Sequence, residues 1–469
     1  MRVKRMRMPG ALMLVLGCLL ILGGCNGAKQ SEKEKQTNGF MRIVNAIPDS
    51  PTLSTTATFD KLSVGGGSVG FGQATALAAL PGPLQVSVTY FDPTTQTTVA
   101  LITVSGVAVP IGHEVTVLIK GTMDAPRTQI IDIPESALGA NQAQVSFLNA
   151  SRAGNLSFYL TDFAASLTGA TPAATLDNDT ASTGSNITAS STLRIRVTPA
   201  GSTTLIDDTA SFAIAAGARF MFIVFDDFGP DPTAVGLLGV DTSSIIIFPN
   251  TAAKAGVRVL NAIPDQVSVT ASLTDTTANV PIGTASAIPV NTFSALNLVK
   301  PTTVALHTVA ASDAALTFDS AAFTLPVNSL NTIVVAGTSI NPANVAAAIL
   351  ISDRRPIKNQ ARLDFVNAAR VSSTTVDFYA VDLSRKLDDA ATTAIVAATG
   401  FLASGSAIGA PQAYDLYATS PGAKTVLAGP LRVTTQGGKS YIVVLGESAS
   451  GGPPLSLTVI DDTNAVPLP

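Results

Sequence analysis

The sequence predicts an all-β chain of four tandem immunoglobulin-like β-sandwich domains. Three observations support this: a short motif recurs about every hundred residues, a late apolar run follows each recurrence, and the composition favours sheet and turn. Only 13% of the 469 residues are charged, and 37 Gly and 28 Pro provide the residues that end strands. A chain of this length fits three or four domains.

The recurring motif ends in Asn-Ala and opens each copy. Its asparagines are 104, 112 and 106 residues apart, at Asn45, Asn149, Asn261 and Asn367. Each copy also contains a late apolar run at a similar offset, beginning at Val115, Phe220, Thr332 and Tyr441. Matches at two separate anchor points predict four domains, which occupy residues 40–140, 141–254, 255–359 and 360–469.

The motif itself has the pattern of a strand. The residues four and two before each asparagine are apolar, and the residue three before it is polar: Arg42, Ser146, Arg258 or Asp364. Alternation with period two predicts a half-buried strand with this polar residue on the open face. The late runs are continuously apolar, which predicts central strands. Two alanine-rich segments, 74–80 and 390–398, are candidates for short helices.

The copies also resemble one another in alternation. The first and third share Asn-Ala-Ile-Pro-Asp, at 45–49 and 261–265, and the second and fourth share Phe-Tyr-x-x-Asp, at 158–162 and 378–382. The pattern indicates duplication of a two-domain unit. Because a sandwich of about 100 residues has enough core to fold alone, we expect the copies to add length or valency. Our hypothesis is an extended array of domains stacked end to end.

The four asparagines are the candidate structural residues. Each falls on the same strand face as the apolar residue two before it, so its amide is expected to be buried. A buried amide must be hydrogen-bonded, and its expected role is to tie the following loop to the sheet. The alternative is an amide that binds a sugar or a peptide.

The first residues have the form of an export signal. A basic start is followed by an apolar run over 11–22 that is too short to span a bilayer, and then by Leu22-Gly-Gly-Cys25. This ending resembles the lipobox of bacterial lipoproteins. These features predict a signal peptide over 1–24. The resemblance implies acylation of Cys25 and, with Asn26 in place of Asp, the outer membrane. Residues 26–39 contain no branched aliphatic or aromatic residue, which predicts a flexible tether over 25–39. The alternative is an uncleaved anchor.

A family resemblance rests on three segments of the first copy: Arg42 to Asp49, Phe71-Gly-Gln-Ala, and Leu80-Pro-Gly. They resemble the bacterial domain-of-unknown-function family 4397. The third copy matches next best, whereas the second and fourth lack the Pro-Asp. The resemblance implies fold and an exported, surface-associated context, and it brings no activity with it.

Other motifs give weak signals for chemistry. Gly65 to Gly70 satisfies two glycine-rich patterns, but no βαβ rhythm surrounds it, so a hairpin or loop is expected. His113 and His307 occupy non-equivalent places. Acidic doublets, including Asp207-Asp208 and Asp461-Asp462, are expected to be solvated turn residues. We therefore expect no catalytic residue, no metal site and no cofactor.

Charge and anchoring set the expected function. Without residues 1–24 the chain has 24 basic and 32 acidic side chains, a net charge of −8, so we expect no nucleic-acid partner. We expect a non-catalytic cell-envelope lipoprotein, held to the membrane by its lipid, with a structural, adhesive or binding role toward a protein or polysaccharide. The alternatives are an accessory subunit or enzyme with an interdomain site, and a carbohydrate-binding module; the absence of Trp weakens the latter.

Overall fold

The computed structural model describes residues 39–463, except for 77, 81, 242–243, 341, 354 and 371–374. The described chain contains 38 strands and one short 3-10 turn, Pro342–Asn344. Its eight sheets stack in twos as four sandwiches, which confirms the predicted all-β fold. No helix among these residues has the length and apolar character needed to cross a membrane.

The first two copies each contain two sheets. The strands of the first copy are β1 (Gly39–Asn45), β2 (Leu53–Phe59), β3 (Leu62–Val69), β4 (Gln73–Ala74), β5 (Ala78–Leu80), β6 (Leu84–Asp92), β7 (Thr97–Val107), β8 (His113–Thr122) and β9 (Ala125–Pro134). Those of the second are β10 (Gln142–Asn149), β11 (Leu156–Asp162), β12 (Ala174–Leu176), β13 (Thr180–Ala181), β14 (Ser185–Thr188), β15 (Ser190–Pro199), β16 (Asp207–Asp208), β17 (Phe212–Ile214), β18 (Arg219–Asp226), β19 (Val235–Val240) and β20 (Ile245–Phe248).

The last two copies repeat this plan. The strands of the third are β21 (Ala255–Ala262), β22 (Ser268–Asp275), β23 (Val280–Pro289), β24 (Thr292–Phe293), β25 (Asn297–Val299), β26 (Thr303–Ala310), β27 (Thr317–Asp319), β28 (Phe323–Thr324), β29 (Leu330–Ala336) and β30 (Ala346–Ser352). Those of the fourth are β31 (Ala361–Asn367), β32 (Val376–Asp382), β33 (Val396–Thr399), β34 (Ser404–Gly409), β35 (Ala413–Thr419), β36 (Val426–Thr434), β37 (Ser440–Gly446) and β38 (Ser456–Asp461).

One pairing organises every copy. The opening strand lies parallel to the late apolar strand in the centre of one sheet, as β1 with β8, β10 with β18, β21 with β29, and β31 with β37. In the first copy this sheet has the order β4-β1-β8-β9, and the facing sheet has the order β3-β2-β6-β7. The continuously apolar late runs are therefore central strands, as their composition predicts.

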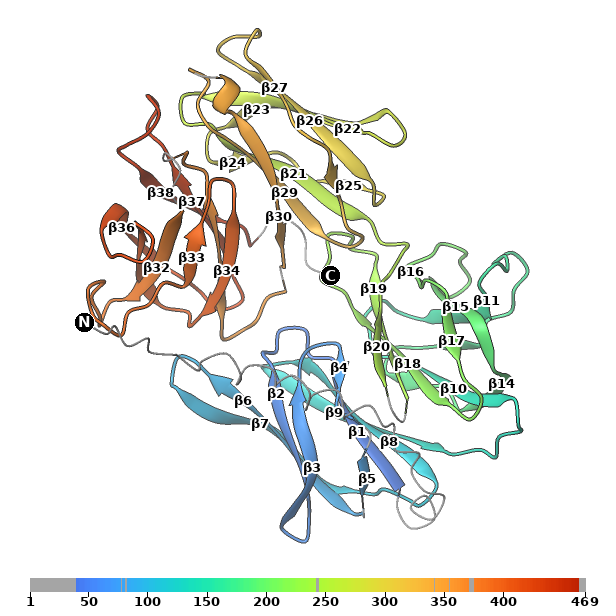
Figure 1. The fold of residues 1–469 in the computed structure, drawn as a ribbon. Helices are drawn as coiled ribbons and strands as arrows, with labels where there is room; N and C mark the ends of the chain where they lie inside the picture. The colour runs from blue at the N-terminus through green and yellow to red at the C-terminus, as the bar shows by residue number, and fades with distance from the viewer. Residues whose placement is uncertain are drawn as a thin grey trace, which may run out of the picture.

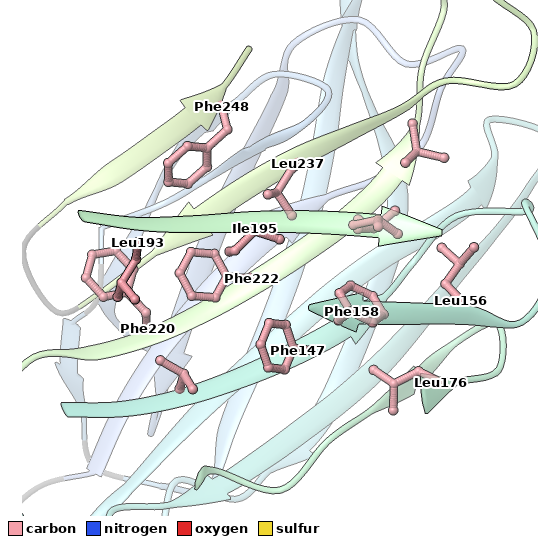
Figure 2. Packing of buried hydrophobic residues seen from close by; sticks show 14 of the residues in the cluster. Phe147, Leu156, Phe158, Leu176, Leu193, Ile195, Phe220, Phe222, Leu237 and Phe248 are labelled. Carbon is pink, nitrogen blue, oxygen red and sulfur yellow. The ribbon is translucent and has the colours of Figure 1, made fainter. Parts of the chain in front are cut away.

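Apolar side chains fill the space between the two sheets of each copy. In the second copy, Phe147 lies 5.2 Å from Phe158 and 5.8 Å from Phe222 between ring centroids, and all three rings are buried (Figure 2). Complete burial of such a side chain contributes about 1.5–3 kcal/mol. Each sandwich therefore has a core of its own.

The outer face of each opening strand is also buried, because a neighbouring copy covers it. Val44 and Leu118 of the first copy pack against Leu148 and Ile223 of the second. We call this interface the first seam. The equivalent second seam packs the third copy on the fourth, through Leu260, Val334, Val366 and Val444. Each copy therefore buries one of its two sheets on both faces.

The expectation of a half-buried opening strand is wrong for this reason. All seven residues of β1 are buried, and so are the polar residues expected on the open face: Arg42, Ser146, Arg258 and Asp364. One face of the opening strand packs in the sandwich core and the other face packs in the seam. Neither face is in contact with solvent. The polar residue on the seam side must then find a partner there.

The expectation of an extended array is also wrong. The four sandwiches lie around a common centre, with the first and second copies (blue and green) opposite the third and fourth (yellow and red) (Figure 1). The linker between the last two copies closes this arrangement on the first copy, where the Lys358 amide donates to the Asp49 carbonyl at 2.9 Å. Asn359 Nδ2 also donates to the Phe91 carbonyl at 3.1 Å.

The two candidate helices are not helical. Residues of the first candidate form β4 and β5, which pair with β1, and Val396–Thr399 at the end of the second forms β33, which pairs with β32. Both segments lie beside an opening or second strand whose edge is free to pair, and ladder hydrogen bonds there override the weak helix propensity of short alanine runs.

Candidate functional site

The four recurring asparagines are buried and make the same two connections. In every copy the side-chain Oδ1 accepts the backbone N–H of the residue two positions later, at 2.9–3.2 Å. Nδ2 donates to a carbonyl on the edge strand of the opposite sheet, at 3.0–3.4 Å, with acceptors Val69, Leu176, Ile288 and Thr399. Each amide thus joins the opening strand, the following loop and the facing sheet.

The backbone carbonyl of each asparagine marks a second recurring feature. It accepts a hydrogen bond from a residue with positive φ: Gly72, Asp179, Asn291 or Leu402. In the first copy the contact with the second copy requires glycine at this position. Its φ is 65°, and a Cβ on Gly72 would lie 2.9 Å from the Phe225 ring of the second copy. The Phe71-Gly72 dipeptide therefore belongs to the contact between copies.

Each seam contains a buried arginine at the equivalent position. In the first seam Arg42 forms an ion pair with Glu114 of its own copy, and its Nη1 donates to the Asp241 carbonyl of the second copy at 3.3 Å. Burial lowers the pKa of Arg42 and raises that of Glu114, although each charge opposes the shift of the other. In the second seam Arg258 Nη1 lies 2.6 Å from Asp462 Oδ1 of the fourth copy.

The Ile-Pro-Asp loops use their aspartates to hold neighbouring loops. The Asp49 carboxylate accepts the Met123 N–H at 2.9 Å. The Asp265 carboxylate accepts the N–H groups of Ser339 and Ile340, both at 3.0 Å. In both copies this connects the loop after the opening strand to the loop after the late strand. The shared dipeptide therefore has a structural explanation in this fold.

Two of the acidic doublets, Asp207-Asp208 and Asp461-Asp462, differ from the expectation of solvated turns. Asp207 and Asp462 are fully buried, and Asp208 is nearly so, paired with Arg194. Both carboxylate oxygens of Asp207 lack a hydrogen-bond partner among the described residues. Burial raises the pKa of Asp207 well above its usual value, and the nearby carboxyl groups of Asp227 and Asp208 add to the shift. Asp207 and Asp208 form β16 and point to opposite faces, and both are buried because protein covers both faces of this short strand.

The remaining sequence motifs are placed as follows. Gly65 to Gly67 lie within the edge strand β3, which forms a hairpin with β2. His113 Nδ1 lies 2.7 Å from Asp132, and His307 Nδ1 lies 2.7 Å from Asp319, and both pairs are at the protein surface. No group of three His, Cys, Asp or Glu in the described part of the chain could hold a metal ion. Cys25 and the signal peptide lie outside the described residues.

A cavity of about 450 Å³ opens where the four copies meet. Small-molecule sites usually have volumes of about 300–1,000 Å³. The described lining residues come from every copy: Phe71, Asp227, Phe228, Gly229, Pro230, Asn328, Ser329, Leu330, Ile351, Ser352, Asp353, Arg355 and Arg362. We call this space the central cavity. It exists only because the array closes on itself.

Aromatic contacts shape one wall of the central cavity. Phe71 lies edge-on to Phe225 and Phe228, with centroids 5.4 and 5.5 Å apart. The Arg355 guanidinium lies 5.4 Å above the Phe71 ring, and its Nη1 donates to the carbonyls of Pro48 and Ser50 at 3.1 and 2.6 Å. Arg355 of the linker therefore contacts the first copy at two places, the Phe71 ring and the loop after β1.

Polar groups also line the central cavity. Arg362 Nη2 lies 2.8 Å from Asp353 Oδ2, and this aspartate is more than half exposed. Asp227 accepts hydrogen bonds from the Gly229 N–H and from Asn328 Nδ2. Burial raises the pKa of Asp227, and these hydrogen bonds oppose the shift. Gly229 permits this approach, because a Cβ there would lie only 1.7 Å from Asn328 Oδ1.

Sequence reasoning missed the central cavity and the seam arginines. A signal for the arginines was present, since Arg42 and Arg258 occupy the same place in otherwise apolar strands of the first and third copies. No equivalent signal marks the cavity, because its residues lie in loops and a linker that do not recur between copies. These residues come together only because the first two copies and the last two copies contact each other. A local sequence pattern does not encode that contact.

One domain family and two solved structures are similar to parts of this chain. No curated protein matches the sequence. The TIE protein of Bacillus anthracis is similar over 84% of this chain and 68% of its own, at 8% identity and a TM-score of 0.16. A candidate cell adhesion protein from Bacteroides ovatus is similar over 46% of this chain and 97% of its own, at 10% identity and a TM-score of 0.18. Residues 39–159, which span the first copy and the start of the second, match the domain of unknown function DUF4397.

Proposed function

We propose that this protein is a non-catalytic lipoprotein of the cell envelope, in which Cys25 carries the lipid and four closed sandwiches form an adhesive or ligand-binding head. The observation that carries the proposal is the closure of the copies. Two seams and the linker hold four sandwiches in one fixed arrangement. A rigid head on a short tether suits contact with a protein or polysaccharide at the cell surface.

The use of the recurring residues supports a binding rather than a catalytic role. The asparagines, the Ile-Pro-Asp aspartates and the seam arginines are all engaged in connections within or between copies. Repetition in this chain therefore maintains the scaffold. Binding groups are expected among the residues that do not repeat, in loops and at the meeting points of copies.

The experiment compares cells that express the full chain with cells that express a lipidated chain without residues 40–463. We expect both chains in the membrane fraction and stronger attachment to a host-matrix or polysaccharide surface only with the full chain. Cys25→Ser should move the full chain out of the membrane fraction and abolish attachment. Equal attachment of all strains would refute the adhesive role, and unchanged membrane partition of Cys25→Ser would refute the lipid anchor.

The central cavity favours a second candidate, an accessory protein with an interdomain site. This function needs the closed arrangement, since residues of all four copies line the cavity. The two candidates differ in ligand size: a polymer or protein surface in the first, and a small molecule in the second. A small-molecule binding measurement on the purified head separates them.

A further inference from the structure

We propose that the central cavity binds one small organic monocarboxylate with an aromatic or aliphatic body, its carboxylate at Arg362 and Arg355 and its body against Phe71 and Phe228. This inference rests on the second candidate function and names its ligand class. It requires neither adhesion nor the lipid anchor, so it succeeds or fails separately from them.

The charge on the cavity wall favours an anion. The two guanidinium groups of Arg355 and Arg362 lie close enough to interact, and the carboxylate paired with Arg362, Asp353, is more than half exposed. Burial lowers the pKa of Arg355; the carboxylates of Asp353 and Asp49 oppose the shift, and the charge of Arg362 adds to it. A carboxylate bound between the two guanidinium groups would relieve their repulsion. Guanidinium groups bind carboxylates through paired, charge-assisted hydrogen bonds.

The same wall limits the charge of the ligand. Asp227 and Asp353 also line the cavity, and a polyanion such as a nucleotide would meet both. Burial raises the pKa of Asp227, and a dianion or trianion would also approach the Asp353 carboxylate directly. A single carboxylate satisfies the arginines without this repulsion.

The rest of the lining favours an apolar body. Phe71 and Phe228 present ring surface, and Pro230, Leu330 and Ile351 complete an apolar wall. The Ile351 side chain is 52% exposed although it lies beside buried strands. Covering this surface is favourable at roughly 25 cal/mol per Å². An aromatic ring stacked on Phe71 or Phe228 would gain ring–ring contacts in addition.

The test uses the full mature chain and two probes of equal shape, 2-naphthoate and the neutral 2-naphthalenemethanol, in calorimetric titrations. We expect one site per chain and an affinity for naphthoate at least about fivefold higher than for the alcohol. Arg362→Gln should weaken naphthoate binding about tenfold, the value of one charge-assisted hydrogen bond, and leave alcohol binding unchanged. Arg362→Lys should recover part of the loss.

Two further variants make the outcome decisive. Arg432→Gln is the matched control, because Arg432 forms a similar pair with Asp415 on the surface of the fourth copy, and it should bind naphthoate normally. Asp353→Asn removes the competing carboxylate and should strengthen naphthoate binding about threefold. The proposal is overturned if naphthoate shows no saturable binding, if the alcohol binds equally well, or if Asp353→Asn fails to strengthen binding. Thermal melts of all variants verify that the head remains folded.

Discussion

The seam between the first two copies and the seam between the last two pack equivalent faces, yet they neutralise their buried arginines with different acids. Arg42 pairs with Glu114 from its own copy, whereas Arg258 pairs with Asp462 from the neighbouring copy. The Arg258 guanidinium also lies 3.9 Å above the Phe293 ring. The first copy therefore carries its own counter-charge, while the third depends on the fourth for one.

The largest predicted effect comes from removing the shared acid. Asp462→Ala leaves Arg258 in an apolar seam without its counter-charge, which should cost about 3–5 kcal/mol of unfolding free energy. Urea unfolding followed by circular dichroism measures the loss. Hydrogen exchange should rise in β21 and β31 together, because the seam itself opens. Glu114→Ala should instead raise exchange mainly within the first copy.

The control for this prediction replaces the whole pair. Arg258→Met combined with Asp462→Leu should recover most of the stability, because well-packed apolar residues often substitute for a buried ion pair without loss. If Asp462→Ala alone is as stable as the native protein, or if its exchange rises only in the fourth copy, the seam does not depend on this pair.

Much of the fold could be predicted from the sequence because its signals are local. The repeated Asn-Ala motif, the alternating strands and the late apolar runs each report a strand environment within a few residues. Asn45 and its equivalents illustrate this, since their face and their place before a loop suffice to predict a buried amide tie. Such features need no knowledge of how the copies meet.

The closure of the four copies could not be predicted in the same way. Arg42 in β1 has the pattern of an exposed polar residue, and only the presence of the second copy makes it buried. Period two identifies two faces of a strand, but it does not state whether water or protein covers the polar one. The central cavity is a step further removed, since it depends on the contact of Arg355 with the first copy.

The asparagine ties are expected to have the next largest effect, and they sharpen the comparison of the two pairs. Among the described residues, which leave out 371–374 beside Asn367, Asn45 and Asn149 each donate to two acceptors, whereas Asn261 and Asn367 each donate to one. Replacement by Ala leaves buried backbone groups unpaired and should cost about 1–3 kcal/mol. We expect losses in the first pair to exceed those in the second.

Chemical denaturation of the four single variants measures these differences, with the exposed Asn155→Ala as the control. Asn155 lies in the loop beside Asn149, so it tests whether any asparagine lost from this region has the same effect. Variants at the four recurring positions that match the stability of the control would show that the amides are dispensable.

Replacement of Asp207, a buried acid that has no arginine partner, is expected to have a smaller effect. It should stabilise the protein, whereas the changes above destabilise it. The raised pKa of Asp207 means that the folded state favours the protonated carboxyl. Its contribution to stability is therefore complete below the unfolded pKa of 3.8 and is lost as pH rises through the folded value. Asp207→Asn should remove this loss and stabilise the protein at pH 8 by about 1–2 kcal/mol.

Melting temperatures of the native protein and Asp207→Asn between pH 4 and 8 test this directly, since the gap should widen as pH rises. Asp208→Asn provides the contrast, because Asp208 is paired with Arg194 and its loss should destabilise. A constant gap between native and Asp207→Asn proteins would mean that Asp207 is ionised in the fold throughout this range.

The smallest effect on stability is predicted for removing the first two copies from the last two. The described contacts that close the pairs are largely polar, and the Lys358–Asp124 ion pair among them is well exposed, so it contributes less than about 1 kcal/mol. The seams, by contrast, bury continuous apolar surface. A chain that lacks residues 40–254 should therefore keep a cooperative melt within a few degrees of the native one, and small-angle scattering should show a shorter maximum dimension. A chain that lacks only 360–469 cuts through a seam, so it should expose Leu260 and Val334 and leave Arg258 without Asp462, with a markedly lower melting temperature and self-association. Equal damage from the two deletions would mean that closure, and not the pair, is the unit that holds this protein together.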